Sequence, residues 1–243
     1  HSWKYRFESE SPVGMLSEYV RNRKLVVKFT RGLRLLHWLN RQFEVRGIVV
    51  LIRHPCAVIA SMLKHGGWDQ RHLQKRGDTP TEQALGGPIP DELYNRFSAS
   101  LNGIETQVDI LAHMWALDYH TAFFEQSDMH PWVLVPYERL VCRGPEELER
   151  IASGLETSVT PGMREHLDVA SVSATEDLRE DERKQLSKWK EALSSEQIDR
   201  ILEIAETYGL DFYSREIEPD YDRLLTYQSP SLKSPVRSMS SVD

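Results

Sequence analysis

Three residues close together in the chain have types and a spacing that could hold a phosphate group. Arg53 follows the apolar segment Gly47–Ile52, and Pro55 stands two positions later. Ser61 lies eight residues after the arginine. A guanidinium fork plus a hydroxyl can bind one anion through charge-assisted hydrogen bonds, and the free N–H groups of a helix start add to the attraction. This spacing predicts an anion site, although an arginine that caps a sheet and a serine on a helix surface would give the same pattern.

The elements that must position these residues alternate between strand and helix. Lys24–Phe29 is a short apolar run that predicts a buried strand, and Leu33–Phe43 has apolar residues at helical spacing. Gly47–Ile52 is an uninterrupted, β-branched segment, which predicts a strand buried on both faces. Pro55 then begins a helix that runs through Leu63. This order predicts an α/β fold with a parallel sheet flanked by helices.

Further elements follow along the chain. The patterns predict a long amphipathic helix at Ile104–Phe124 and a short strand at Trp132–Val135. They also predict a helix opened by Pro145 and two charged helices, at Glu176–Leu193 and Ser195–Tyr208. Ser194 and Gln197 can form a capping box at the start of the last of these. Gly66–Pro90 is rich in loop-forming residues, and we expect a long loop there. We expect residues 1–226 to form one domain and residues 227–243, with six Ser, to be a disordered tail.

Composition excludes several classes of protein. The net charge of −7 argues against a nucleic-acid binder that acts by bulk attraction. Cys56 and Cys142 are far apart and lack metal-ligand spacing, so we expect neither a zinc site nor a disulfide framework. No apolar run is long enough to cross a membrane, and the sequence contains no Asn-x-Ser/Thr acceptor. These features favour a cytoplasmic protein without a membrane segment.

The segment from Arg53 to Ser61 resembles the 3′-phosphate motif of the sulfotransferase family. In that family a strand ends in Arg, then come x-Pro, a helix, and a Ser eight residues after the Arg. This chain departs from the pattern at His54, where Asp or Asn is usual. The resemblance implies a P-loop-like α/β fold and a sulfuryl donor, 3′-phosphoadenosine 5′-phosphosulfate, whose 3′-phosphate Arg53 and Ser61 hold. It implies no metal.

Three further residues take roles from the same resemblance. Lys28 matches a family lysine placed near the transferring sulfuryl group. Tyr137, in Val133–Leu140, matches a tyrosine that lies beside the adenine. Lys188 lies in a segment around Trp189 that is loosely similar to one that closes over the cofactor in some members. From the residues alone, the alternatives are a strand-end lysine that reaches solvent, an ordinary core tyrosine and an amphipathic helix with Trp189 in the core.

The phosphate-cradling loop of the family, Pro-x-x-Gly-Thr/Ser-Thr/Ser after a first strand, has no counterpart in this sequence. Because residue 1 is His rather than Met, we expect that strand and loop to lie upstream of a truncated chain. Thr30 occupies the position at which cytosolic members carry a catalytic His, so the general base stays unknown. The histidines left as possibilities are His37, His54, His65 and His113.

The leading hypothesis is a sulfotransferase that acts on a hydroxyl or amine of a carbohydrate or small molecule, with little or no transfer by this chain alone. The main alternative is a non-catalytic, truncated or degenerate domain that binds adenosine 3′,5′-bisphosphate or a protein partner. A nucleotide-dependent kinase is a weaker alternative, because the sequence has no Walker A motif. Acceptor identity and oligomeric state do not follow from the sequence.

Overall fold

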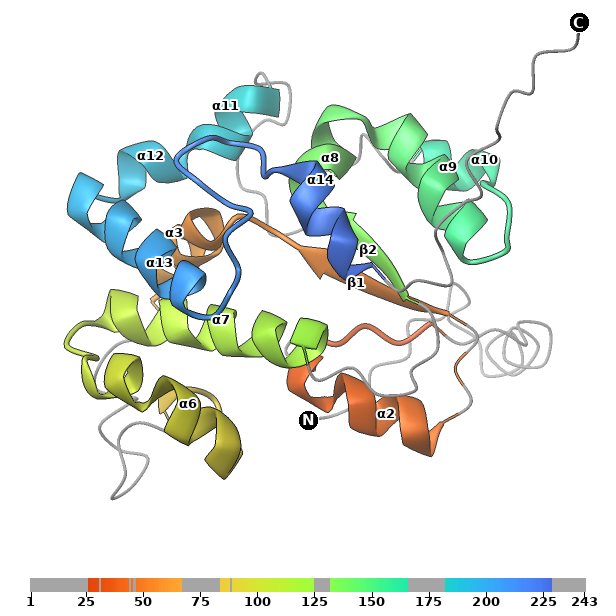
Figure 1. Cartoon of the computed structure of the whole chain (residues 1–243). Coiled ribbons are helices and arrows are strands. Elements are labelled where there is room, and N and C mark those ends of the chain that lie inside the picture. Colours follow the sequence, from red (N-terminus) through yellow and green to blue (C-terminus); the bar gives the residue numbers. More distant parts are fainter. Residues whose placement is uncertain are drawn as a thin grey trace, which may run out of the picture. The chain divides into compact units, whose positions relative to one another are not determined.

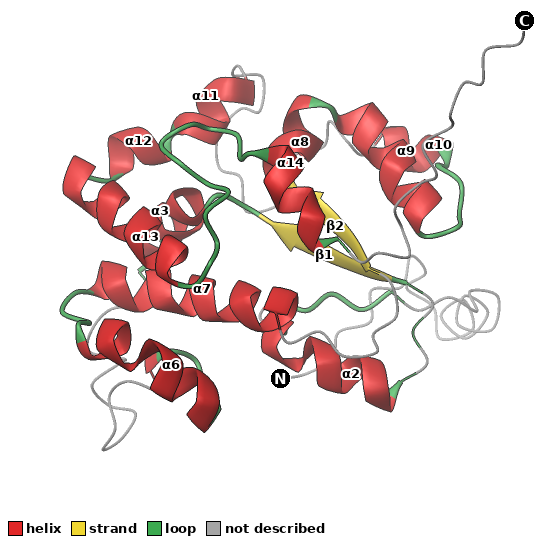
Figure 2. Cartoon of the chain, in the orientation of Figure 1, coloured by secondary structure: helices red, strands yellow, loops and turns green. Residues whose placement is uncertain are grey.

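The computed structural model divides the chain into two compact units, residues 1–32 and residues 33–243, each described by itself. The residues that it describes are 26–30, 32–43, 45, 47–66, 84–87, 89–124, 132–165 and 182–228. Among these described residues, all helices and strands belong to the second unit (Figures 1 and 2). Most of the predicted loop, the first part of Glu176–Leu193 and residues 229–243 lie outside the described residues.

The second unit is mostly helical with a small parallel sheet, broadly an α/β fold. Its elements, in chain order, are η1 (Leu33–Leu35), α2 (Leu36–Gln42), β1 (Ile48–Ile52), α3 (Pro55–Lys64), α6 (Asp91–Asn102), α7 (Gln107–Phe124), β2 (Trp132–Pro136), α8 (Tyr137–Cys142), α9 (Gly144–Gly154), α10 (Pro161–Glu165), α11 (Glu182–Ser187), α12 (Trp189–Ala192), α13 (Ser195–Thr207), α14 (Tyr221–Leu224) and η2 (Leu225–Tyr227).

The sheet within the described residues consists of β1 and β2, which pair in parallel with Ile48 opposite Trp132 and Ile52 opposite Pro136. The chain connects them through α3, α6 and α7, as a parallel pair requires a long crossover. The two strands were predicted from their apolar, β-branched runs, and both predictions are confirmed. Because the strands are parallel and in register, their carboxyl ends lie side by side.

Two strand predictions need correction. Residues 26–29, part of the strand predicted at Lys24–Phe29, form no strand, because a strand exists only where a neighbouring backbone pairs with it. β1 is buried on one face only: Val50 and Ile52 are buried, but Val49 and Leu51 are 47% and 50% exposed. The uninterrupted apolar sequence of β1 therefore does not correspond to a strand that is buried on both faces.

Helix α7 passes through the middle of the core rather than along its surface. The sequence predicted an amphipathic helix, but α7 is buried on nearly all sides, including Asp109, His113 and His120. These polar groups are tolerated because each has a partner. Arg200 and the Thr106 hydroxyl bind Asp109, and the two histidines bind the hydroxyl and the carbonyl of Tyr208.

Helix α7 also anchors the end of β1. The Tyr119 hydroxyl donates to the Leu51 carbonyl over 2.9 Å, and the Trp115 indole N–H donates to the Arg53 carbonyl over 3.2 Å. Helices α12 and α13 pack on α3, and α8 and α9 pack on β2 (Figure 1). Helices from both halves of the chain therefore pack on the sheet and on the helix that follows β1.

The chain remains packed up to its last described element. Tyr227 in η2 stacks on Phe123 with ring centroids 5.0 Å apart, and its carbonyl accepts from the Trp132 indole N–H. The predicted start of the tail at residue 227 therefore falls inside this element, because an aromatic contact with α7 holds Tyr227.

Candidate functional site at the ends of the two strands

Arg53 lies at the carboxyl end of β1 and Tyr137 lies at the carboxyl end of β2. The strand register explains this proximity, because Ile52 pairs with Pro136 and each residue follows directly after one of them. The Arg53 guanidinium carbon lies 4.6 Å from the centroid of the Tyr137 ring, a distance at which a cation and an aromatic face attract each other. The structure thus brings these two predicted site residues together.

The Arg53 guanidinium makes no hydrogen bond or ion pair with any residue that the structure describes. The side chain is half-buried, and its Nε is fully buried without a partner among the described residues. A guanidinium has five N–H donors, and a buried donor without an acceptor is costly. Arg53 is therefore suited to an acceptor-rich, negatively charged ligand.

Ser61 lies about one and a half turns into α3 and is half-buried. Helical spacing places it on the same face as Ala57, whose small side chain is 6% exposed. No hydrogen bond joins Ser61 to Arg53 within the described part of the chain. Ser61 belongs to α3, whereas Arg53 lies two residues before that helix begins.

The carboxylate of Glu138, next to Tyr137, holds the two strand ends together. It is 1% exposed, and it accepts the His54 backbone N–H over 2.8 Å and the Tyr213 hydroxyl over 3.1 Å. Burial raises the pKa of Glu138, against the lowering effect of these hydrogen bonds and of the Arg53 charge. Each carboxylate oxygen accepts one of these hydrogen bonds, and within the described residues neither is bonded to the Arg53 guanidinium.

His54 caps the start of α3 and is 1% exposed. Its Nδ1 accepts the Cys56 backbone N–H over 3.2 Å, and its Nε2 lies 2.9 Å from the Ser214 carbonyl. The ring stacks on Trp189 with centroids 4.4 Å apart and planes inclined by 22°. Burial, together with the positive charges of Lys190 and Arg53, lowers the pKa of His54 to about 4. The imidazole is therefore neutral at physiological pH.

Lys188 and Lys190 flank the tryptophan that stacks on His54. Lys188 is an exposed residue at the start of α12. The Lys190 ammonium lies 5.4 Å from the centroid of the Trp189 ring, and its charge lowers the pKa of His54. The charge of Lys190 thus acts on the ring of His54, next to the end of β1, whereas the resemblance had pointed to Lys188.

Lys28 is exposed and belongs to residues 1–32, the other compact unit. Among the histidines that could act as a general base, His37, His54 and His113 are buried, and each has a hydrogen bond to a distant part of the chain. Burial and the Arg200 charge lower the pKa of His113 to about 4. Only His65 among these four is exposed.

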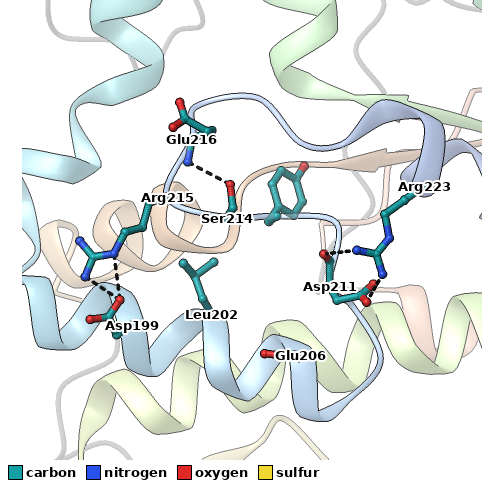
Figure 3. Close-up of a pocket in the computed structure, with 9 residues that line it drawn as sticks. Asp199, Leu202, Glu206, Asp211, Ser214, Arg215, Glu216 and Arg223 are labelled. Carbon is teal, nitrogen blue, oxygen red and sulfur yellow. Dashed lines mark hydrogen bonds and ion pairs between the residues drawn. The ribbon is translucent and has the colours of Figure 1, made fainter.

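An open hollow of about 530 Å³ lies beside the segment after α13 (Figure 3). Its lining includes four carboxylates and two arginines: Asp199, Glu206, Asp211, Glu216, Arg215 and Arg223. Arg215 pairs with Asp199 over 2.6 Å, and Arg223 pairs with Asp211. Both guanidinium groups are engaged, so this hollow does not suit a phosphate, in contrast to the ends of the strands.

Three residues of the strand-end site escaped sequence reasoning in these roles: His54, Glu138 and Lys190. Their roles depend on contacts with distant parts of the chain, such as that between His54 and Ser214, 160 residues apart. The departure at His54 from the usual Asp or Asn was the one visible hint.

The described residues contain no group of three or more His, Cys, Asp or Glu side chains that could hold a metal ion. None of the described helices is both long and apolar enough to cross a membrane. Comparisons with protein-family models, with curated proteins and with solved structures give no match to this chain.

Proposed function

We propose that this chain is a sulfotransferase-type domain with a P-loop-like sheet, and that Arg53 and Ser61 bind the 3′-phosphate of 3′-phosphoadenosine 5′-phosphosulfate. The observation that carries the proposal is the Arg53 guanidinium, which stands over Tyr137 at the end of β1 without a hydrogen bond or ion pair to any described residue. In this proposal Tyr137 contacts the adenine, as the resemblance to the family implies.

A phosphate at the end of β1 would accept hydrogen bonds from the Arg53 guanidinium, which has no such partner among the described residues. The carboxylate of Glu138 accepts from His54 and Tyr213 and, within the described residues, makes no hydrogen bond with the Arg53 guanidinium. A phosphate offers several acceptors and a negative charge, and Arg binds such groups with two parallel hydrogen bonds. The start of α3 adds a favourable dipole beside it.

Sulfuryl transfer needs more than this half-site. The sulfur must lie in line between acceptor oxygen and leaving phosphate oxygen, with positive groups on the charge that develops. We assign Lys28 to the sulfuryl group on the resemblance alone, and the acceptor is a hydroxyl or amine of a carbohydrate or small molecule. The sequence lacks the loop that holds the 5′-phosphosulfate, so we expect residues 1–243 to bind the nucleotide but to transfer sulfate poorly.

The test is titration calorimetry with adenosine 3′,5′-bisphosphate on the parent chain and on Arg53→Ala. The variant loses charge-assisted hydrogen bonds that contribute roughly 1.5–3 kcal/mol to binding. We therefore expect its affinity for the bisphosphate to be about 10- to 100-fold lower. The same titration with adenosine 5′-phosphate, which lacks the 3′-phosphate, should give similar affinities for the two proteins.

Arg96→Ala is the matched control, because Arg96 is an exposed arginine whose partner is Glu92 one turn earlier. Its affinity for the bisphosphate should equal that of the parent chain. Equal affinities for Arg53→Ala and the parent would remove Arg53 from the site, and an absence of any binding by the parent would refute the proposed function.

A binding domain without catalysis is the second candidate. The observation in its favour is that three of the four histidines considered as general base are buried and hydrogen-bonded to the protein. A transfer assay with radiolabelled donor and a panel of hydroxyl and amine acceptors separates the two candidates. Turnover by residues 1–243 favours the enzyme, whereas binding without turnover, even after a family-type loop is fused upstream, favours the binding domain.

A further inference from the structure

One residue, His54, joins five parts of the second unit through its backbone and its ring. It follows Arg53 at the end of β1, and its backbone N–H donates to Glu138 of α8 over 2.8 Å. Its ring binds the Cys56 N–H in the first turn of α3 and the Ser214 carbonyl beyond α13. The ring also stacks on Trp189 of α12. These contacts leave the ring 1% exposed.

The contacts define the protonation state of the imidazole. Because Nδ1 accepts the N–H of Cys56, the ring proton must be on Nε2, where it is donated to the Ser214 carbonyl. A second proton on Nδ1 would face an N–H group and break the cap. The positive charges of Arg53 and of Lys190 in α12 also disfavour an imidazolium, whereas hydrogen bonds with the backbone of Ser214 and Glu216 act in the opposite direction. The Glu138 carboxylate of α8 lies nearby, on the backbone N–H of the same residue.

We propose that His54 is a positioning residue for the anion site: through its neutral, Nε2-protonated ring it fixes Arg53, the start of α3, Trp189 and the segment at Ser214 in one arrangement. The inference rests on the proposed function, since it assigns His54 to the site that binds the 3′-phosphate. His54 itself does not touch the anion. It acts through the backbone next to Arg53, since the Arg53 guanidinium itself makes no hydrogen bond within the described residues.

Replacing a histidine that only stabilises the fold should leave bisphosphate binding nearly unchanged, unlike replacing one that positions the anion site. His113 supplies the comparison, because it is 0% exposed and its Nδ1 lies 2.9 Å from the Tyr208 hydroxyl. It lies on α7 and interacts with the charges of Asp109 and Arg200 rather than with Arg53. Replacing either histidine removes a buried hydrogen bond, but only His54 is tied to the end of β1.

The experiment compares His54→Asn with His113→Asn by calorimetric titration with adenosine 3′,5′-bisphosphate at pH 7.5, well below the melting temperature of both variants. Asparagine can still cap α3 by accepting the N–H of Cys56, but it is too short to reach the Ser214 carbonyl as well. We expect His54→Asn to bind about 10-fold more weakly than the parent and His113→Asn to bind within about twofold of it. Affinity of His54→Asn within twofold, or an equal loss in His113→Asn, overturns the proposal.

Nitrogen NMR of the imidazole rings tests the arrangement independently of binding. We expect the His54 ring to show the Nε2-protonated tautomer and to stay neutral above pH 5. An Nδ1-protonated ring, or one that titrates near its ordinary value of 6.5, overturns the proposal even if affinities change as expected. If the parent chain binds no bisphosphate, the proposed function fails and this role of His54 fails with it, whereas normal parent binding with an unaffected His54→Asn refutes the inference alone.

Discussion

At the scale of single residues, His54 and His113 are buried in their neutral forms, and burial lowers the pKa of each to about 4. A neutral imidazole has one donor and one acceptor, so it can satisfy two partners without a charge. The unfolded chain takes up a proton near pH 6.5, well before the folded chain does. Acidification therefore favours the unfolded state through both residues.

This linkage predicts how the stability cost of His54→Asn depends on pH. The contribution of a neutral His54 is complete above pH 6.5 and is lost as the pH falls from 6.5 towards about 4. The parent chain should lose up to about 1.4 kcal/mol per pH unit from this group in that window. Urea unfolding of parent and variant at pH 7, 6 and 5 measures the difference, which should be largest at pH 7. Glu138 changes the free energy of unfolding with pH in the opposite direction, but it is present in both proteins and its effect cancels in the comparison. If the difference in unfolding free energy between parent and variant does not change with pH, the prediction is wrong.

At the scale of elements, α12 presents a cation towards the ends of the strands. Trp189 carries the contact, because its ring stacks on His54 while the ammonium of Lys190 lies 5.4 Å from its centroid. Lys190 makes no ion pair with any residue that the structure describes. A bound phosphate would feel this charge in addition to that of Arg53.

We therefore predict that Lys190→Ala weakens binding of adenosine 3′,5′-bisphosphate about threefold at low salt, a size typical of an exposed charge. Lys188→Ala, two residues earlier, is the matched control and should bind within the error of the parent chain. In 0.5 M NaCl the loss in Lys190→Ala should shrink, because salt screens exposed charges. A larger loss in Lys188→Ala would return the role to the lysine that the sequence had suggested.

At the scale of the whole molecule, the last described element closes the core rather than beginning a tail. Tyr227 packs on Phe123, accepts from Trp132 through its carbonyl, and donates its hydroxyl to the Gly209 carbonyl. These contacts connect the end of the domain to α7, to β2 and to the turn after α13. Stability of the fold should therefore depend on η2.

Two truncations test this boundary. A chain that ends after Gln228 should unfold within about 0.5 kcal/mol of the full chain, because it removes only the Ser-rich segment that the sequence predicts to be disordered. A chain that ends after Leu224 loses η2 and should be destabilised by about 2–4 kcal/mol, the range for losing a packed aromatic side chain. Thermal unfolding monitored by circular dichroism gives the comparison. Equal stability of the two truncated chains would show that η2 contributes nothing.

The sequence by itself determined the elements whose signals are local. The β-branched runs predicted β1 and β2, the helical spacing predicted α7, and the Ser194–Gln197 pair predicted the capping box that begins α13. Local patterns also predicted too much: residues 26–29 form no strand, and α7 has no solvent-facing polar side. In both cases the outcome depends on what lies beside the segment, which periodicity does not contain.

Only the tertiary structure decided which side chains meet. The register of two parallel strands places Arg53 beside Tyr137, and folding brings Ser214 to His54 across 160 residues of chain. The neutral state of His54 and the engaged state of Glu138 arise from burial and from partners on other elements. The physical reason is that a residue's type and spacing fix what bonds it can make, whereas long-range packing fixes which bonds are left for a ligand.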